Sequence, residues 1–309
     1  MPGRAPRSDP GKGVRVRWSA DCMQAQWTPP NGLLTLPGRT GGKGMRIGPS
    51  AKETLWFEYE NYRRHERFLR LSQEEKAIVE AFKKDGCYLY KNAIGDDVIE
   101  VINIALDEWM VDNISGLAAN KRADGTFPRL IGLHEEVPAL QKLFSNATAL
   151  KLGELLFGRG SGLYTSITFL QGSQQPLHRD IPVFRVSPGN LYFRIWFALE
   201  DTTAENGTLT GVRGGHRVAA DRYKTAHRFY GRFDDIPEQD PAIWRAYQET
   251  LRQKYEDAGL AEEKFALSKG DLLIWHPLFP HGGSVIENKT SSRRSVVLHV
   301  SEVPPSAGL

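Results

Sequence analysis

The sequence has only two cysteines, Cys22 and Cys87, among its 309 residues. Two cysteines cannot form a disulfide framework, so we expect a protein that folds without disulfides in a reducing cytoplasm. The chain also lacks any run of about 18 apolar residues, so no membrane-spanning helix is predicted. Residues 1–17 are basic but contain no apolar stretch, which is not typical of a secretory signal.

Negative charge is scarce at the start of the chain. Residues 1–50 hold eight Lys/Arg against two Asp, a net charge of +6, whereas the remaining residues carry a net charge of −3. This stretch is rich in Gly and Pro, so we predict an irregular arm over residues 1–50. A basic arm can contact nucleic acid, but no recognised binding motif accompanies it, and we expect neither a nucleic-acid nor a membrane partner.

Helical patterns fill the first half of the remaining chain. Ser72 and Glu75 form a capping-box pattern that predicts a helix up to Gly86, followed by a strand at 87–90. Asp97 is expected to cap a second helix. Its predicted apolar face consists of Val98, Val101, Ile102, Leu106 and Trp109.

The pattern changes to short strands after residue 160. Residues 113–137 look like a loop, and Asn146 is expected to cap the last helix of this half. Strands are then predicted at 164–170, 191–199, 208–212, 265–267, 272–276 and 295–300. A helix is predicted at 241–258, inside a long polar insertion at 213–264. Helices followed by many strands, without a βαβ alternation, favour a barrel or sandwich with flanking helices.

Two segments carry residues that could bind a metal. In His178-Arg179-Asp180 the imidazole and the carboxylate are two residues apart, so in an extended segment they face the same way while Arg179 faces away. A second imidazole from His281, 103 residues later, could complete a three-ligand face. Two histidines and one carboxylate are typical of non-haem Fe(II) oxygenases.

The order and spacing of several motifs resemble the phytanoyl-CoA dioxygenase family of Fe(II)/2-oxoglutarate oxygenases. The matching segments are 175–180, 195–201, 206–209, 214–217, 270–271, 281–283 and 292–295. The resemblance implies a mainly β fold with flanking helices, built around a double-stranded β-helix (a jelly roll, as in cupins). It also implies a single domain over 51–309, with a helical part at 51–160, a jelly-roll core at 161–303 and a lid insertion at 213–264.

The resemblance places the metal on His178, Asp180 and His281. His276 is an alternative third ligand, but His281 is followed by the Gly-Gly pair that the family shows, so we favour His281. His276 is then expected to be a packed histidine or one that supports a ligand.

The resemblance also implies an arginine for the distal carboxylate of 2-oxoglutarate, because a buried carboxylate needs a cationic partner. Arg293 shares a strand face with Ser295 and His299, as in the family, whereas Arg294 shares the other face with apolar residues. We predict Arg293, with Arg294 as the alternative. Trp196 stands where the family places an indole beside the cosubstrate, although a plain core tryptophan is equally compatible.

The implied cofactors are Fe(II), 2-oxoglutarate as cosubstrate and dioxygen, with ascorbate as a possible stimulant. The implied reaction oxidises an aliphatic C–H of a small metabolite, with hydroxylation as the favoured outcome, and releases succinate and CO2. An anionic metabolite is a candidate substrate. Because Asp180 is present, halogenation is not expected, since family halogenases have a small residue there. A zinc hydrolase and a non-catalytic metal-binding jelly roll are the alternatives. The protein-kinase tripeptide His-Arg-Asp is excluded, because no Gly-rich loop or Asp-Phe-Gly accompanies it.

Overall fold

A computed structural model describes residues 17–19, 54–180, 192–219 and 241–302. Its α-helices are α1 (Glu66–Arg70), α2 (Gln73–Asp85), α3 (Asp96–Asp112), α4 (Ile114–Ala119), α5 (Ala147–Phe157) and α7 (Pro241–Asp257). None of these helices is both long and apolar enough to cross a membrane. Most of the predicted arm, and residues 220–240 of the predicted lid, lie outside the described residues.

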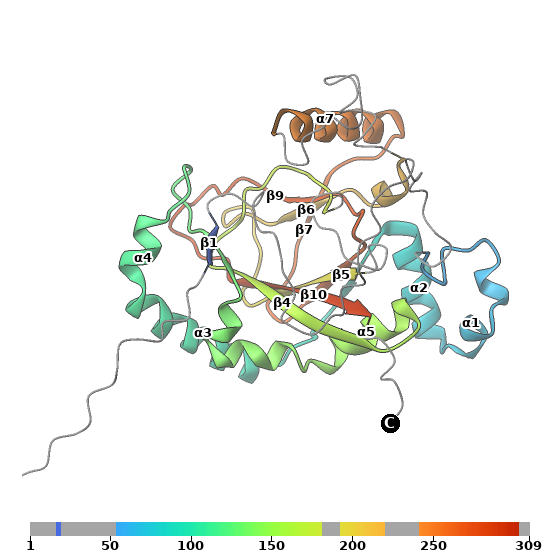
Figure 1. Cartoon of the computed structure of the whole chain (residues 1–309), viewed down its shortest axis with the longest axis horizontal. Coiled ribbons are helices and arrows are strands. Elements are labelled where there is room, and N and C mark those ends of the chain that lie inside the picture. The colour runs from blue at the N-terminus through green and yellow to red at the C-terminus, as the bar shows by residue number, and fades with distance from the viewer. Residues whose placement is uncertain (1–16, 20–53, 181–191, 220–240, 303–309) are drawn as a thin grey trace, which may run out of the picture.

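Two antiparallel sheets face each other. The larger has seven strands in the order β1-β3-β4-β10-β5-β8-β2, and the smaller has the order β7-β6-β9. The strands are β1 (Arg17–Ser19), β2 (Cys87–Tyr90), β3 (Arg129–Ile131), β4 (Ser161–Phe169), β5 (Tyr192–Ala198), β6 (Leu209–Gly211), β7 (Glu263–Phe265), β8 (Leu272–Trp275), β9 (His281–Gly283) and β10 (Ser295–Glu302). Figure 1 shows α3 and α5 below the larger sheet and α7 above the smaller one.

The larger sheet buries different residues on its two faces, because successive side chains of a strand point to opposite sides. On β5, Phe193, Ile195 and Phe197 join the core that packs under the helices. Trp196 and Ala198 belong instead to the cluster between the two sheets. Every residue of β5 is buried, as the prediction of a strand covered on both sides requires.

The predicted helix boundaries are largely confirmed. Ser72 and Glu75 form both bonds of the capping box, and Gly86 ends α2 with a φ of 78°, a conformation that glycine adopts without strain. Asn146 accepts a hydrogen bond from the backbone N–H of Ala149 and begins α5.

Two details of α3 were predicted wrongly. The helix begins one residue before Asp97, with Gly95 at its N-cap, so Asp97 lies in the first turn. In the first turn, the negative charge of Asp97 still interacts favourably with the positive end of the helix dipole. Val101 is 47% exposed rather than buried, because Ile99, Ile102 and Leu106 face the sheet.

The segment 113–137 is not a plain loop. It contains α4 and β3, and β3 pairs with both β1 and β4. The residues of β1 fall within the arm that was predicted to be irregular. A strand of three residues is too short to show an alternating pattern, so neither β1 nor β3 could be recognised from the sequence.

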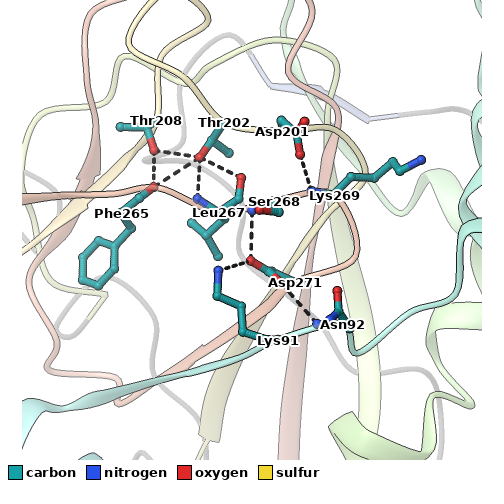
Figure 2. A network of polar contacts seen from close by, with 10 residues as sticks. All are labelled: Lys91, Asn92, Asp201, Thr202, Thr208, Phe265, Leu267, Ser268, Lys269 and Asp271. Carbon is teal, nitrogen blue, oxygen red and sulfur yellow. Dashed lines mark hydrogen bonds and ion pairs between the residues drawn. The ribbon is translucent and has the colours of Figure 1, made fainter.

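A buried polar network fixes the turn before β8 (Figure 2). The carboxylate of Asp271 is fully buried and accepts hydrogen bonds from the Lys91 ammonium at 2.7 Å, the Asn92 N–H at 3.2 Å and the Ser268 N–H at 2.9 Å. Gly270 has a φ of 91°, which a residue with a side chain rarely adopts. The Gly-Asp motif thus connects β2 to the turn that starts β8.

Candidate metal centre

The three predicted metal ligands lie together between the two sheets. His178 and Asp180 follow β4, and His281 is the first residue of β9. The backbone N–H of His178 donates to His281 O at 2.8 Å, and the N–H of His281 donates to His178 O at 2.9 Å. This reciprocal pair joins two segments that are far apart in the sequence. His281 lies on the short strand β9, whose three residues, His-Gly-Gly, have no strand pattern in the sequence.

The two glycines after His281 allow the ligand segments to approach each other. A Cβ on Gly282 would lie 2.7 Å from Gln175 O, and one on Gly283 would lie 2.4 Å from Ser173 Oγ. These contacts are shorter than real Cβ atoms show. The Gly-Gly pair is therefore needed for backbone packing beside the metal ligands.

One ligand atom from each residue points to a shared space, and these atoms all lie within 4.8 Å of one another. Nδ1 of His178 donates to Pro176 O at 2.9 Å, and Nδ1 of His281 donates to Phe279 O at 2.9 Å. These bonds select the tautomer in which Nε2 has a free lone pair. Metal-binding histidines are commonly held in this way.

The electrostatics of the three residues suit a divalent cation. Burial lowers the pKa of His281 to about 3, so its imidazole is neutral at pH 7 and can donate a lone pair. The amide of Gln175 donates a hydrogen bond to Nε2 of His178 at 2.8 Å, which agrees with a lone pair on this nitrogen. In an octahedral site with bonds of about 2.1 Å, neighbouring ligand atoms are about 3 Å apart. Asp180 Oδ1 and His281 Nε2, at 3.8 Å, need only a small further movement.

Arg179 faces away from its two neighbours, as predicted. Its side chain is buried and donates to Gly215 O at 2.5 Å and to Val218 O at 2.7 Å. Its guanidinium lies 5.6 Å from the ring centre of Tyr255 on α7. The residue between the ligands thus anchors their segment to α7 and the chain before it.

His276 does not lie with the three ligand atoms. Its Nε2 is 3.3 Å from a carboxylate oxygen of Glu58, and its Nδ1 accepts a hydrogen bond from the N–H of Leu278 at 3.0 Å. Both ring nitrogens are therefore used in contacts with neighbouring residues. This geometry agrees with the expected role of a packed histidine.

The two neighbouring arginines have opposite environments. Arg294 lies on the helix side, where it pairs with Asp107 of α3 and lies 3.6 Å from Glu200. Arg293 is 2% exposed and lies between the sheets, 5.4 Å from the ring centre of Trp196 and 5.9 Å from that of Phe169.

The guanidinium of Arg293 forms no ion pair within the part of the chain that the structure describes. It donates to Gly207 O at 3.2 Å and to Ser295 Oγ at 3.4 Å, and its Nε has no hydrogen-bond partner among the described residues. Burial lowers the pKa of Arg293 to about 10, so the group remains cationic at pH 7. A buried cation with unused donors fits a bound carboxylate.

Sequence reasoning missed one charged residue of this interior. Arg194 is the single charged residue of the apolar strand β5, and its Nε lies 2.5 Å from Asp180 Oδ2. A lone arginine in a strand that is buried on both sides needs a buried partner. That requirement is the signal that could have identified Arg194.

The sequence is similar to curated proteins of one kind. Phytanoyl-CoA dioxygenase from Homo sapiens is 27% identical over 125 residues, which is 40% of this chain and 32% of the human protein. A probable phytanoyl-CoA dioxygenase from Caenorhabditis elegans is 26% identical over 125 residues, 40% of this chain and 35% of that protein. The chain therefore matches about a third of the length of these curated relatives.

Solved structures show the same fold. EctD from S. alaskensis, crystallised with bound Fe, aligns with a TM-score of 0.54 at 16% identity, covering 75% of this chain and 77% of EctD. SnoK, described as a non-heme alpha ketoglutarate dependent carbocyclase from nogalamycin biosynthesis, aligns with a TM-score of 0.55 at 15% identity, covering 76% and 85%. These alignments confirm the predicted jelly-roll fold.

The family model described as phytanoyl-CoA dioxygenase (PhyH) matches residues 133–296, just over half of the chain. This match includes the ligand segments and both arginines. The chain belongs to the phytanoyl-CoA dioxygenase (PhyH) family.

Proposed function

We propose that this protein is an Fe(II)/2-oxoglutarate-dependent dioxygenase that hydroxylates an aliphatic C–H of a small anionic metabolite. One observation carries the proposal. The same space between the sheets contains a His-Asp-His set of ligand atoms and a buried arginine that has no ion pair within the described chain. A zinc hydrolase needs the first feature but has no use for the second.

His178, Asp180 and His281 would hold the iron, each with one ligand atom. When bound, iron and 2-oxoglutarate use dioxygen to oxidise a C–H bond and release succinate and CO2. The protein's part is to bind and orient the reactants and to exclude water. Because Asp180 supplies a carboxylate, hydroxylation is favoured over halogenation.

Arg293 would bind the distal carboxylate of 2-oxoglutarate with its planar guanidinium. The indole of Trp196 and the ring of Phe169 flank this guanidinium, and both residues belong to the apolar cluster between the sheets. This surrounding strengthens a charged contact by keeping water away from it. Ser295, which contacts Arg293, is a second donor on the same strand face.

The charges near the metal end favour an anionic substrate. Burial is the main cause of the lowered pKa values of His178 and His281, and the positive charge of Arg129, on β3, contributes to lowering both, so it acts across the metal site. Carboxylates, phosphonates and CoA esters are the classes to test. EctD was crystallised with 2-oxoglutarate and 5-hydroxyectoine, a small molecule, whereas the curated relatives are named for a CoA ester.

The segment 113–137 and the described parts of the insertion, 213–219 and 241–264, are proposed to cover the metal end of the sandwich. In support, Tyr247, Leu251 and Tyr255 of α7 form a cluster that includes Leu177, the residue before the first ligand. Loops and insertions around a rigid scaffold commonly select the substrate.

The test is turnover with a metabolite mixture. Purified protein with Fe(II) and 2-oxoglutarate should release succinate slowly alone and faster when a substrate is present, and mass spectrometry should detect a product heavier by one oxygen atom. The His281→Ala variant should release no succinate above the protein-free background. Hydrolysis of an ester or amide that requires zinc and does not depend on 2-oxoglutarate would contradict the proposal.

A further inference from the structure

A buried cation touches the carboxylate of the candidate metal centre. Arg194 lies on β5 with its side chain 6% exposed, and its Nε is 2.5 Å from Asp180 Oδ2. Its Nη1 is 2.5 Å from Nε2 of His299 on β10, the residue that pairs with it across the two strands. The guanidinium is thus held between a carboxylate and an imidazole in the interior.

The contact makes the two oxygens of Asp180 different. Oδ1 lies 3.8 Å from Nε2 of His281, on the side of the other ligand atoms, whereas Oδ2 faces Arg194. Guanidinium groups are not deprotonated in proteins, so a positive charge stays beside Oδ2. Oδ1 is therefore the oxygen that we expect to contact a metal.

Fold stability does not explain an arginine at this position. Replacing a buried ion pair by apolar residues of similar volume is often neutral or stabilising. The neighbours of Arg194 on β5 are the apolar residues Phe193 and Ile195, and every residue of the strand is buried. A role at the metal centre is the alternative that the contact with Asp180 supports.

We propose that Arg194 is a positioning residue that limits Asp180 to a single metal-binding oxygen. This proposal rests on the proposed function. A carboxylate that offered both oxygens would take one of the open positions that a chelating cosubstrate and dioxygen require. By holding Oδ2, Arg194 keeps that position available.

His299 would hold the guanidinium in this orientation. Its Nε2 can accept the Arg194 N–H only when the imidazole is neutral. Burial and the charge of Arg194 lower the pKa of His299 well below its ordinary value, so it is neutral at pH 7. Asp180, Arg194 and His299 thus form one continuous set of contacts from the metal centre to β10.

The experiment uses Co(II) as the only added metal, because its visible spectrum reports the number of ligands. Arg194→Met should still bind Co(II), but its spectrum without 2-oxoglutarate should differ from that of the unmodified protein. The dissociation constant for Co(II) should rise about 10–100-fold, the range typical of residues that orient metal ligands, and 2-oxoglutarate should bind more weakly than to the unmodified protein. Arg194→Lys replaces the planar guanidinium with a single ammonium, so its Co(II) spectrum should lie between those of Arg194→Met and the unmodified protein.

Arg293→Met is the matched control, because it also removes a buried interior arginine but one whose hydrogen bonds go to Gly207 and Ser295. Its Co(II) spectrum without 2-oxoglutarate should equal that of the unmodified protein. Circular dichroism checks the fold of each variant, and Arg194→Gln, which stays polar, replaces Arg194→Met if the latter does not fold. Unchanged spectra and unchanged 2-oxoglutarate affinity in folded Arg194 variants would overturn the role of Arg194. If His281→Ala instead bound Co(II) as tightly as the unmodified protein, the metal site and the proposed function would be overturned.

Discussion

The two faces of the larger sheet contain residues of different kinds, although the same strands build both. On β10, the helix-facing side chains Val296, Leu298 and Val300 are apolar and fully buried. On the other face Val297 is apolar, but Ser295, His299 and Arg293, which lies just before the strand, are buried polar or charged residues. Burial is therefore almost equal on the two faces, and only the chemistry differs.

The difference shows which face stabilises the fold and which face binds ligands. Apolar burial stabilises a protein by about 25 cal/mol per Å² and needs no ligand. A buried cation destabilises it unless a partner is present. Arg194 has a carboxylate partner in Asp180, whereas Arg293 has no carboxylate partner among the described residues and donates only to neutral oxygens there. Substitutions on the two faces should therefore have separable effects.

The largest effect is expected at the metal ligands of the inner region. His281→Ala removes one of three ligands and should weaken Fe(II) binding by more than about 100-fold, since changes to residues that only orient ligands cost 10–100-fold. His276→Ala is the control, because that ring contacts Glu58 and Leu278. Metal titration under anaerobic conditions measures both. Loss of iron in His276→Ala with retention in His281→Ala would reverse the assignment.

The next effect separates the two neighbouring arginines. Arg293→Met should weaken binding of 2-oxoglutarate by on the order of 2–5 kcal/mol, at least tenfold, because a buried carboxylate loses its cation. Arg294→Met should leave this affinity unchanged, since Arg294 pairs with Asp107 on the helix side. Arg293→Lys should lose most of the affinity as well. If Arg294→Met bound 2-oxoglutarate weakly and Arg293→Met bound it normally, the cosubstrate would bind Arg294 instead.

A smaller effect is expected at Gly282, which directly follows His281 but has no metal-binding atom of its own. The methyl group of Gly282→Ala would lie 2.7 Å from Gln175 O, so the backbone segments that carry His178 and His281 must separate. Fe(II) affinity should fall by roughly 10-fold, the lower end of the range for residues that support ligands. Gly125→Ala is a suitable stability control, since its Cβ would meet nothing within 4 Å, although its positive φ adds strain. Equal iron affinity in both variants would exclude this role for Gly282.

The smallest effect on the site should come from the outer face. Leu298→Ala removes a fully buried side chain of the helix-covered core and should lower the free energy of unfolding by about 2–5 kcal/mol. Fe(II) and 2-oxoglutarate affinities of the folded variant should stay within about twofold, because distant sites act independently. Thermal denaturation and the two titrations together test this, and a large loss of affinity would show that the faces are coupled.

The sequence was sufficient for the fold class and for the grouping of the three ligand residues. Strand alternation alone separates Arg293 from Arg294, because neighbouring residues of a strand cannot share a face. Ser72, Gly86 and Asn146 likewise mark helix ends through local hydrogen bonds and backbone conformation. These features depend on a few adjacent residues, so they can be predicted.

Features that depend on distant contacts could not be predicted. His281 lies on a strand because β9 pairs with β6, and β3 forms because it pairs with β1 and β4. The contact between Arg194 and Asp180 joins β5 to the metal segment across the interior. None of these pairings leaves a periodic pattern in three-residue strands or in single charges.

The most direct test of the central claim is an anaerobic titration of the Fe(II)-loaded protein with 2-oxoglutarate, followed by visible absorption. Chelation of the iron by the cosubstrate should produce a charge-transfer band in the unmodified protein and in Arg294→Met at the same concentrations. The band should require at least tenfold more 2-oxoglutarate in Arg293→Met and should be absent in His281→Ala. A protein that gives no band, or one whose band is unaffected by Arg293→Met and His281→Ala, would contradict the account.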